Sequence, residues 1–285
     1  MWKILLQLPQ IYLAIRKERR WLVETVERLK IDVVISDNRL GMYCSLAHSI
    51  YMTHQLAIKT GNGFMDKIAQ RLHYSYINRF NECWVPDQEK EIDSIAGRLS
   101  HTNIKPKTPV RYIGWLSRLK PRDVDIQHDL VVLISGPEPH RTLFENRVVE
   151  ILAGYSGKAM LVRGLPAAHK PLKGLPSNIM QANHLDSAAI SDVIQGAQLI
   201  VSRSGYSTVM DLLKMGKRAI LVPTPGQTEQ EYLASRLQDL GWFLSRDQDL
   251  LCADDFNVAP PVKNVGADCF VLFEAALKRV ENEQN

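Results

Sequence analysis

Residues 198–213, QLIVSRSGYSTVMDLL, contain the clearest indication of fold in this sequence. An apolar run, 199–202, leads without a break into Arg203, Ser204 and Gly205, and a segment with helical spacing follows at once. This order predicts a strand–turn–helix unit of a parallel α/β sheet, a class that binds ligands at the carboxyl ends of its strands. The free N–H groups and the positive dipole end of such a helix suit a phosphate.

Hydroxyl side chains gather where this helix starts. Ser204, Ser207 and Thr208 can donate hydrogen bonds to a phosphate, and Gly205 allows either close approach of a ligand or a positive φ. Asp211 lies four residues after Ser207 and three after Thr208, on the same helical face, where it could accept both hydroxyl protons of a ribose. The alternative is ordinary helix capping, for which Ser and Thr are favoured without any ligand.

Two further strand-end turns fit the same pattern. In residues 218–237, RAILVPTPGQTEQEYLASRL, an apolar strand runs through a Pro/Gly turn into a helix, where Glu229 and Gln230 can hydrogen-bond sugar hydroxyls. Ser135 and Gly136 follow another apolar strand. Helix capping also accounts for the acidic start of the second helix. Three such turns are nevertheless expected to converge on one edge of the sheet.

The remaining sequence extends this pattern in both directions. Beyond residue 130 it predicts a complete doubly wound domain, with strands at 131–134, 159–162, 179–181, 199–202 and 219–222 and helices at 140–153, 188–196, 207–215 and 229–240. The first 115 residues predict helices at 13–29 and 64–80 and strands at 32–36, 49–53 and 82–85. Because three strands are few and no Gly-rich turn follows an opening strand, the N-terminal half is expected to be incomplete.

The chain is therefore predicted to hold two α/β domains. The expected parts are a partial Rossmann-like domain at 1–115, a linker at 116–129, a ligand-binding domain at 130–266 and a C-terminal helix at 267–285 that packs on one of the two domains. Asp123 and Asp125 have the spacing of a metal-binding DxD motif. Because they lie in the polar linker and not at a strand end, we predict no metal site there.

Composition narrows the function classes. The net charge of +4 is too mild to indicate nucleic-acid binding. The four cysteines, Cys44, Cys83, Cys252 and Cys269, lack metal or disulfide spacing, so we expect reduced thiols in a cytoplasmic protein. The apolar stretch 4–15 is too short for a membrane span and lacks the features of a signal peptide. With the basic run 16–20 after it, it forms either a core helix with a solvated end or a helix that lies on a membrane surface.

The segments 130–148, 200–213 and 221–234, in this order and spacing, resemble the C-terminal domain of family 28 glycosyltransferases. The resemblance is good over about 131–240 and loose in the N-terminal half. It implies the GT-B fold, two facing Rossmann-like domains, with a UDP-sugar held mainly by the C-terminal one. It also implies that neither a metal nor another cofactor is needed.

The resemblance matches the donor-binding positions of the family to specific residues of this sequence. Ser204, Gly205, Ser207 and Thr208 would surround the diphosphate, and Asp211 falls where the family carries a Glu for the ribose. Glu229 and Gln230 fall at a glutamine pair that faces the donor sugar, and the uracil would lie near His184 and Leu185. The full predicted donor site is Ser135, Gly136, Leu185, Ser202, Arg203, Ser204, Gly205, Ser207, Thr208, Asp211, Gln227, Glu229 and Gln230.

Besides Asp211, this sequence departs from the family in three further places. Pro137 replaces the serine of a Gly-Gly-Ser-x-Gly loop, and Glu229 replaces an amide, so the donor sugar is left open. The family's N-terminal Gly-rich loop has no counterpart, and Met1 falls inside what the resemblance suggests is the middle of the acceptor domain. His54, in a segment similar to the family's acceptor side, is either a catalytic base or a structural histidine.

The resulting expectation is an inverting, metal-independent hexosyltransferase. It would move a sugar from a UDP-sugar to a hydroxyl of a lipid-linked or glycan acceptor, at the cytoplasmic face of a membrane if the first helix lies on it. Two alternatives remain open: a UDP-sugar epimerase or hydrolase, and a truncated, non-catalytic UDP-sugar-binding protein.

Overall fold

A computed structural model describes residues 2–58, 63–165, 170–263 and 265–284. The chain divides into two compact units, Met1–Trp115 with Asp268–Asn285, and Leu116–Ala267. Each unit is built on a parallel β-sheet of its own, which confirms the predicted α/β class with two Rossmann-like domains. Among the described helices, none combines the length and apolar character of a membrane span.

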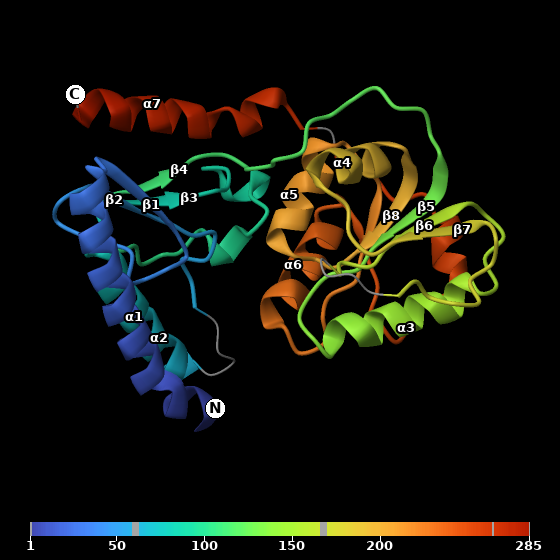
Figure 1. Cartoon of the computed structure of the whole chain (residues 1–285), viewed down its shortest axis with the longest axis horizontal. Helices are drawn as coiled ribbons and strands as arrows, with labels where there is room; N and C mark the ends of the chain where they lie inside the picture. The colour runs from blue at the N-terminus through green and yellow to red at the C-terminus, as the bar shows by residue number, and fades with distance from the viewer. Residues whose placement is uncertain (1, 59–62, 166–169, 264, 285) are drawn as a thin grey trace. The chain divides into compact units, whose positions relative to one another are not determined.

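The first unit is a small three-layer sandwich. Its sheet has the order β1-β2-β3-β4, and all neighbouring strands are parallel. In Figure 1, α1 and α2 lie on one side of this sheet and α7 on the other. The elements are α1 (Trp2–Leu29), β1 (Val33–Asp37), β2 (His48–Met52), α2 (Gly63–Ile77), β3 (Glu82–Val85), 3-10 turns at Glu91–Asp93 and Gly97–Leu99, β4 (Val110–Tyr112), a 3-10 turn at Ala267–Phe270 and α7 (Leu272–Gln284).

The C-terminal helix α7 completes this unit. Arg279 of α7 donates to Glu82 of β3 at 2.6 Å, and Phe273 packs edge-on against Trp84 at 5.9 Å between ring centroids. Gly114 has φ +72°, and a Cβ there would lie 2.5 Å from the carbonyl oxygen of Cys269, so only glycine fits beside the returning chain. The helix expected to pack on one of the two domains therefore packs on the N-terminal one.

Several element limits differ from the sequence predictions. The sheet of the first unit has four strands, whereas the sequence predicted three. The fourth strand, β4, was missed because it is only three residues long and follows Pro109. Helix α1 begins at Trp2 and continues through Pro9, whereas the predicted helix began at residue 13. Side chains of residues 1–9 and 11 lie outside the described residues, so the apolar part of the expected surface helix is described only from Tyr12 onward.

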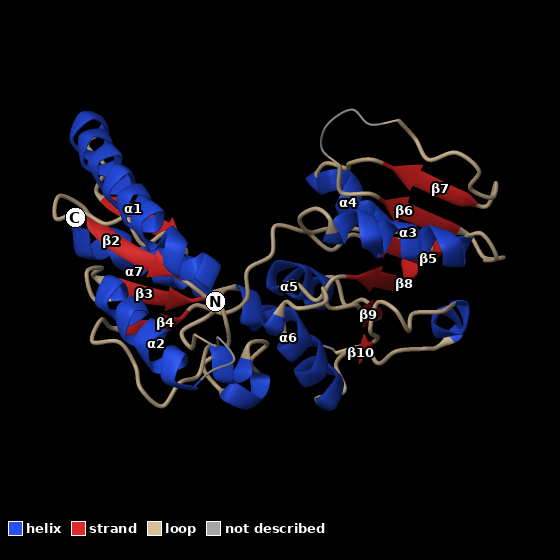
Figure 2. Ribbon diagram, turned by 90° about the horizontal axis from the view of Figure 1, so that it is seen from below, coloured by secondary structure: helices blue, strands red, loops and turns tan. Residues whose placement is uncertain are grey.

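The second unit is a doubly wound domain. Its sheet has the order β10-β9-β8-β5-β6-β7 with all strands parallel, and Figure 2 shows them in that sequence. In Figure 1, α3 lies along one face and α4 along the other. The elements are β5 (His128–Leu133), α3 (His140–Leu152), β6 (Ala159–Val162), β7 (Ile179–Ala182), α4 (Ser187–Gln195), β8 (Ala197–Ser202), α5 (Tyr206–Lys214), β9 (Ala219–Leu221), α6 (Thr228–Asp239), β10 (Leu244–Ser245) and a 3-10 turn at Ala253–Asn257.

The strand order contains a switch point. The chain runs outward from β5 to β6 and β7, then crosses back to place β8 on the other side of β5. At such a reversal the loops after the two central strands diverge to opposite faces, which opens a crevice at their carboxyl ends. The core beneath it contains apolar residues from several strands and α3, including Leu130, Val132, Phe144, Val148 and Val201, all fully buried. The turns that follow β5 and β8 therefore border this crevice.

Candidate functional site

The strands of the second unit end in register. Leu133 of β5 pairs with Ser202 of β8, and Ser202 pairs with Leu221 of β9. On the other side Leu133 pairs with Val162 of β6, which pairs with Ala182 of β7. The predicted turns all begin within three residues of this row, so they lie on one edge of the sheet, as expected from the sequence.

Four helices begin at this edge, and carboxylates accompany three of them. Asp186 caps α4 by accepting from the N–H groups of Ala188 and Ala189 at 3.0 and 2.8 Å. At the start of α3, Glu138 accepts from the N–H of Thr142 at 3.2 Å. The first turn of α6 contains acidic residues at 229 and 231. A carboxylate at a helix start offsets the positive end of the helix dipole.

Helix α5 is different. Its N-cap is Gly205, no side chain caps it and its first turn contains no acidic residue. Ser207 at the second helical position is exposed, and Thr208 is half-buried. The positive end of α5, at the switch point of the sheet, is therefore uncompensated by any carboxylate of its own first turn, which is the arrangement that anion sites at helix starts use.

Gly205 has φ −69°, so of the two alternatives predicted for this glycine the positive φ does not apply. Its other predicted property, space for a close approach, agrees with the geometry, because a Cβ at this position would meet only Thr208 Oγ1, at 3.9 Å. Gly136, in the turn after β5, has φ +108° and open space around it. Ser135 and Gly136 are both exposed. Glycine is thus required by backbone conformation at 136 and not at 205.

Ser202 and Ser204 are buried, at 1% and 0% exposure. Ser204 Oγ donates to the backbone oxygen of Gln230 at 2.8 Å, and Ser202 Oγ donates to that of Arg203 at 3.3 Å. Neither hydroxyl caps α5, so the capping interpretation does not explain Ser204. In this structure the Ser204 hydroxyl ties the turn after β8 to the start of α6.

Arg203 is 1% exposed, and its guanidinium points into the unit. Its donors reach Gln248 Oε1 at 2.6 Å and the backbone oxygens of Val222, Pro223 and His140 at 3.2, 3.0 and 3.1 Å. Burial lowers the pKa of Arg203 to about 10. Val222 and Pro223 follow β9, Gln248 follows β10 and His140 is the first residue of α3, so Arg203 fastens the turn after β8 to three neighbouring segments. Its place in the motif did not predict this supporting role.

Asp211 lies on α5, on the same face as Ser207 and Thr208, and is half-buried. Ser117 Oγ donates to Asp211 Oδ1 at 2.6 Å. Burial raises the pKa of Asp211, and the Ser117 hydrogen bond and the charge of Arg118 oppose that rise. Sequence reasoning missed Ser117 because it lies 94 positions away, in a segment that reads only as a linker.

The start of α6 is ordered by amide side chains. Gln230 Oε1 accepts from the N–H of Thr224 at 3.0 Å, and Gln230 Nε2 donates to Gln227 Oε1 at 2.7 Å. Gln227, Glu229 and Gln230 are all half-buried. Their predicted contact with a sugar stays a prediction, and the bonds within the turn keep the Gln230 amide in one orientation.

A buried ion cluster supports the opposite half of this edge. Glu145 of α3, 4% exposed, accepts from Arg163 Nε at 2.7 Å and from Arg141 Nη2 at 3.2 Å. Arg163, directly after β6, also donates to Asn183 Oδ1 at 2.8 Å, two residues before the half-buried Leu185. Burial alone would raise the pKa of Glu145, but the arginine hydrogen bonds lower it below its ordinary value. The cluster fixes the turns after β6 and β7.

Two other predicted positions lie elsewhere in the chain. His54 follows β2 of the first unit by two residues and is half-buried, beside Thr53, whose Oγ1 accepts from the N–H of Gln55 at 3.1 Å. Asp123 and Asp125 are exposed in a segment without helix or strand. Within the described residues no group of three or more His, Cys, Asp and Glu side chains could hold a metal ion.

Comparison with known proteins agrees with this geometry. Residues 170–251 match the family model described as the glycosyltransferase family 28 C-terminal domain. This range contains the turns after β7, β8 and β9 and the starts of α4, α5 and α6.

Two curated relatives are UDP-N-acetylglucosamine–N-acetylmuramyl-(pentapeptide) pyrophosphoryl-undecaprenol N-acetylglucosamine transferases. The protein from Desulforudis audaxviator is 36% identical over 91 residues, 31% of this chain and 23% of that relative. The protein from Alkaliphilus oremlandii is 24% identical over 251 residues, 81% of this chain and 64% of that relative. The chain thus spans less than two thirds of the length of these relatives.

A solved structure, the glycotransferase of kitacinnamycin, superposes with a TM-score of 0.60 at 14% identity, over 98% of this chain and 78% of that one. Another, CalG4, the calicheamicin glycosyltransferase, gives a TM-score of 0.56 at 15% identity, over 97% and 77%. At these identities the likeness shows the fold alone. It confirms the predicted GT-B class.

Proposed function

We propose that this chain, which carries the C-terminal domain of a family 28 glycosyltransferase, binds a UDP-sugar and transfers its hexosyl group to a hydroxyl of a lipid-linked or glycan acceptor. The observation that carries the proposal is the start of α5. There a helix begins at the switch point of a parallel sheet, with the exposed Ser207, the half-buried Thr208 and no carboxylate in its first turn. The positive dipole end and free N–H groups would hold the diphosphate, and Asp211 would hold the ribose.

The same site would stabilise the departing UDP. When the bond between the anomeric carbon and the diphosphate breaks, negative charge grows on the β-phosphate, and fixed N–H and hydroxyl donors stabilise that charge without rearrangement. Ser207 and Thr208 would add hydroxyl donors, while Glu229 and Gln230 would face the sugar. We propose inversion at the anomeric carbon, with an acceptor hydroxyl attacking from the side opposite the diphosphate.

The proton of the attacking hydroxyl needs an acceptor. His54, at the carboxyl edge of the first sheet, is our candidate base by its resemblance to the family's acceptor-side segment. Since the α5 start supplies the positive field that a metal otherwise provides, we propose metal-free transfer. A chelator should leave the rate unchanged, and a rate restored only by added divalent metal would contradict this part of the proposal.

The test of the function uses the full chain with a panel of UDP-hexoses. UDP should bind in calorimetry, and Asp211→Ala should weaken it by about tenfold, the scale of hydrogen bonds to a charged group. Release of UDP from a UDP-sugar should require an acceptor. Unchanged affinity in Asp211→Ala would remove the ribose assignment.

The same assay separates the two other readings. Epimerised sugar or free hexose formed without an acceptor would indicate an epimerase or hydrolase. UDP binding without turnover on any acceptor pool would indicate a protein that only binds the donor.

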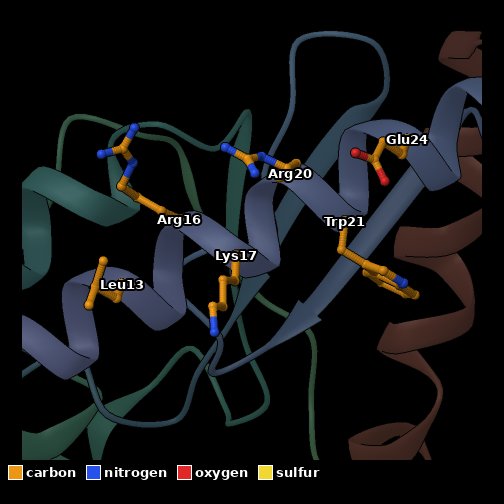
Figure 3. Close-up of a pocket in the computed structure, with 6 residues that line it drawn as sticks. All are labelled: Leu13, Arg16, Lys17, Arg20, Trp21 and Glu24. Atoms are coloured by element: carbon orange, nitrogen blue, oxygen red, sulfur yellow. The ribbon is translucent and has the colours of Figure 1, made fainter.

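We also propose contact with a membrane surface through α1. Its exposed face carries Leu13, Arg16, Lys17, Arg20, Trp21 and one acidic residue, Glu24, around an open pocket (Figure 3), and Leu13 and Trp21 are 55% and 57% exposed. Cationic side chains beside exposed apolar ones are typical of helices that lie on anionic lipid. Such contact would bring the chain to a lipid-linked acceptor at the inner face of a membrane.

Co-sedimentation with vesicles tests this contact. The chain should bind vesicles that contain anionic lipid and release them at high salt, while vesicles of neutral lipid should bind less. Failure to bind anionic vesicles even at low salt would remove the membrane proposal without touching the donor site.

A further inference from the structure

Residues 116–122 form a strap, a stretch without helix or strand, that lies against α4 and α5 of the second unit. The N–H of Leu116 points to the sulfur of Met210 on α5 at 3.2 Å. Ser191 of α4 donates to the backbone oxygen of Lys120 at 2.9 Å. Arg122, at the end of the strap, also pairs with Asp192 of α4 at 3.2 Å. The strap is thus fastened to both helices whose starts border the predicted donor site.

Ser117 is the residue of the strap that reaches the predicted donor residues. Its hydroxyl donates to Asp211 Oδ1 at 2.6 Å and accepts from the N–H of Leu119 at 3.2 Å. A serine hydroxyl has one proton. The N–H of Leu119, a residue that is 2% exposed, occupies a lone pair of the Ser117 oxygen. The hydroxyl proton is therefore directed at Asp211, and the carboxylate is held in one orientation.

This contact occupies one of the two carboxylate oxygens. Asp211 Oδ1 accepts the hydrogen bond from Ser117. The other oxygen, Oδ2, is not engaged by Ser117, and the carboxylate lies on the same helix face as Ser207 and Thr208. A half-buried carboxylate needs donors, since a polar group removed from water without partners is costly. The ribose hydroxyls of a nucleotide whose diphosphate lies at the α5 start would supply them.

We infer that Ser117 is a positioning residue that orients the Asp211 carboxylate for the ribose of the donor, so that the strap gives the site its preference for ribonucleotides. The inference rests on the proposed function, because it takes Asp211 as the ribose contact. A carboxylate free to rotate would lose part of its hydrogen bonding to the sugar hydroxyls, whereas the diphosphate contact at the α5 start would be untouched. Loss of Ser117 should therefore affect ribose recognition selectively.

The experiment compares UDP with 2′-deoxy-UDP by calorimetry on the full chain. The unaltered protein should bind UDP about tenfold more tightly than 2′-deoxy-UDP, the scale of one hydrogen bond to a charged group. Ser117→Ala should lose most of this preference through weaker UDP binding, with 2′-deoxy-UDP unchanged. Ser117→Thr, which keeps the hydroxyl, should restore it.

Ser191→Ala is the matched control. It removes another serine hydroxyl that fastens the strap but does not touch Asp211, so it should keep the preference for UDP. Thermal unfolding midpoints identify any variant that fails to fold. The role of Ser117 would be overturned, while the proposed function stands, by either of two results. One is an equal loss of the preference for UDP over 2′-deoxy-UDP in Ser191→Ala. The other is full preference in a folded Ser117→Ala when Asp211→Asn has lost it. Equal binding of both nucleotides by the unaltered protein would overturn the inference through Asp211, and absence of UDP binding would overturn the proposed function as well.

Discussion

Helices α4 and α5 begin at the same edge of one sheet, yet their first turns are completed in different ways. Asp186 accepts two backbone N–H groups at the start of α4, whereas α5 starts at Gly205 with no side-chain cap. The first arrangement satisfies the helix internally. The second leaves a positive helix end at the switch point of the sheet. The contrast separates a helix start that is built for stability from one that is suited to an anionic ligand.

The largest expected effect concerns the support of this edge. Glu145→Ala would leave Arg141 and Arg163 buried without their shared carboxylate, and we expect a loss of about 3–5 kcal/mol in unfolding free energy. Chemical denaturation measures it. Glu150→Ala, which removes an exposed glutamate of the same helix, is the control and should change little.

The Glu145 effect should depend on pH. Because folding lowers the pKa of Glu145, its contribution is present above the pKa of the unfolded chain and is lost as pH falls through the folded value. The difference between the unaltered protein and Glu145→Ala should therefore shrink in acid. A difference that stays constant down to acid pH would contradict the ionised cluster.

A carboxylate placed at the start of α5 would make it resemble the other helix starts. In Ser207→Asp, repulsion between the new charge and the diphosphate should weaken UDP binding by about 100-fold or more. The stability of the variant should be unchanged or higher, since an acidic residue at a helix start is favourable. Ser235→Asp, the same change at an exposed position within α6, should bind UDP normally. Equal binding by both variants would place the diphosphate elsewhere.

Removal of the α4 cap gives the converse result. Asp186→Ala should lower the unfolding free energy by about 1 kcal/mol, because the N–H groups of Ala188 and Ala189 lose their acceptor. Calorimetry should find the UDP affinity unchanged. A loss of binding as large as that of Ser207→Asp would mean that the two helix starts do not differ in function.

The smallest effect is a gain in stability. Burial raises the pKa of Asp211, so its ionised form destabilises the ligand-free chain above the pKa of the unfolded state. Asp211→Asn should raise the melting temperature by about 1–3 °C at neutral pH, and the gain should vanish in acid, where both side chains are neutral. A lower melting temperature at neutral pH would show that the Ser117 contact outweighs burial.

Much of the second unit could be predicted from sequence because its strands are short apolar runs bounded by turn residues. The run at 199–202 lies within β8, and the helix after it begins one residue before the predicted start. Strands β4 and β10 were missed because three and two residues are too few to show a period. Their pairing with a neighbouring strand, which no local pattern encodes, defines them.

Residues of the candidate site could be predicted from the sequence where they come directly after a strand. They could not be predicted where their orientation depends on contacts with distant parts of the chain. The exposure of Ser207 follows from its place in the motif. The inward turn of Arg203 depends on four acceptors at His140, Val222, Pro223 and Gln248, and the partner of Asp211 comes from Ser117. Spacing along the chain could not reveal these contacts, because they form only when the three turns and the strap meet.

The central claim is that the start of α5 holds the donor diphosphate, and a crystal structure of the chain with UDP tests it most directly. The account predicts diphosphate oxygens about 3 Å from the backbone nitrogen of Ser207 or Thr208, with the ribose at Asp211. A diphosphate bound at the start of α4 or α6, or at the amino edge of the sheet, would contradict it.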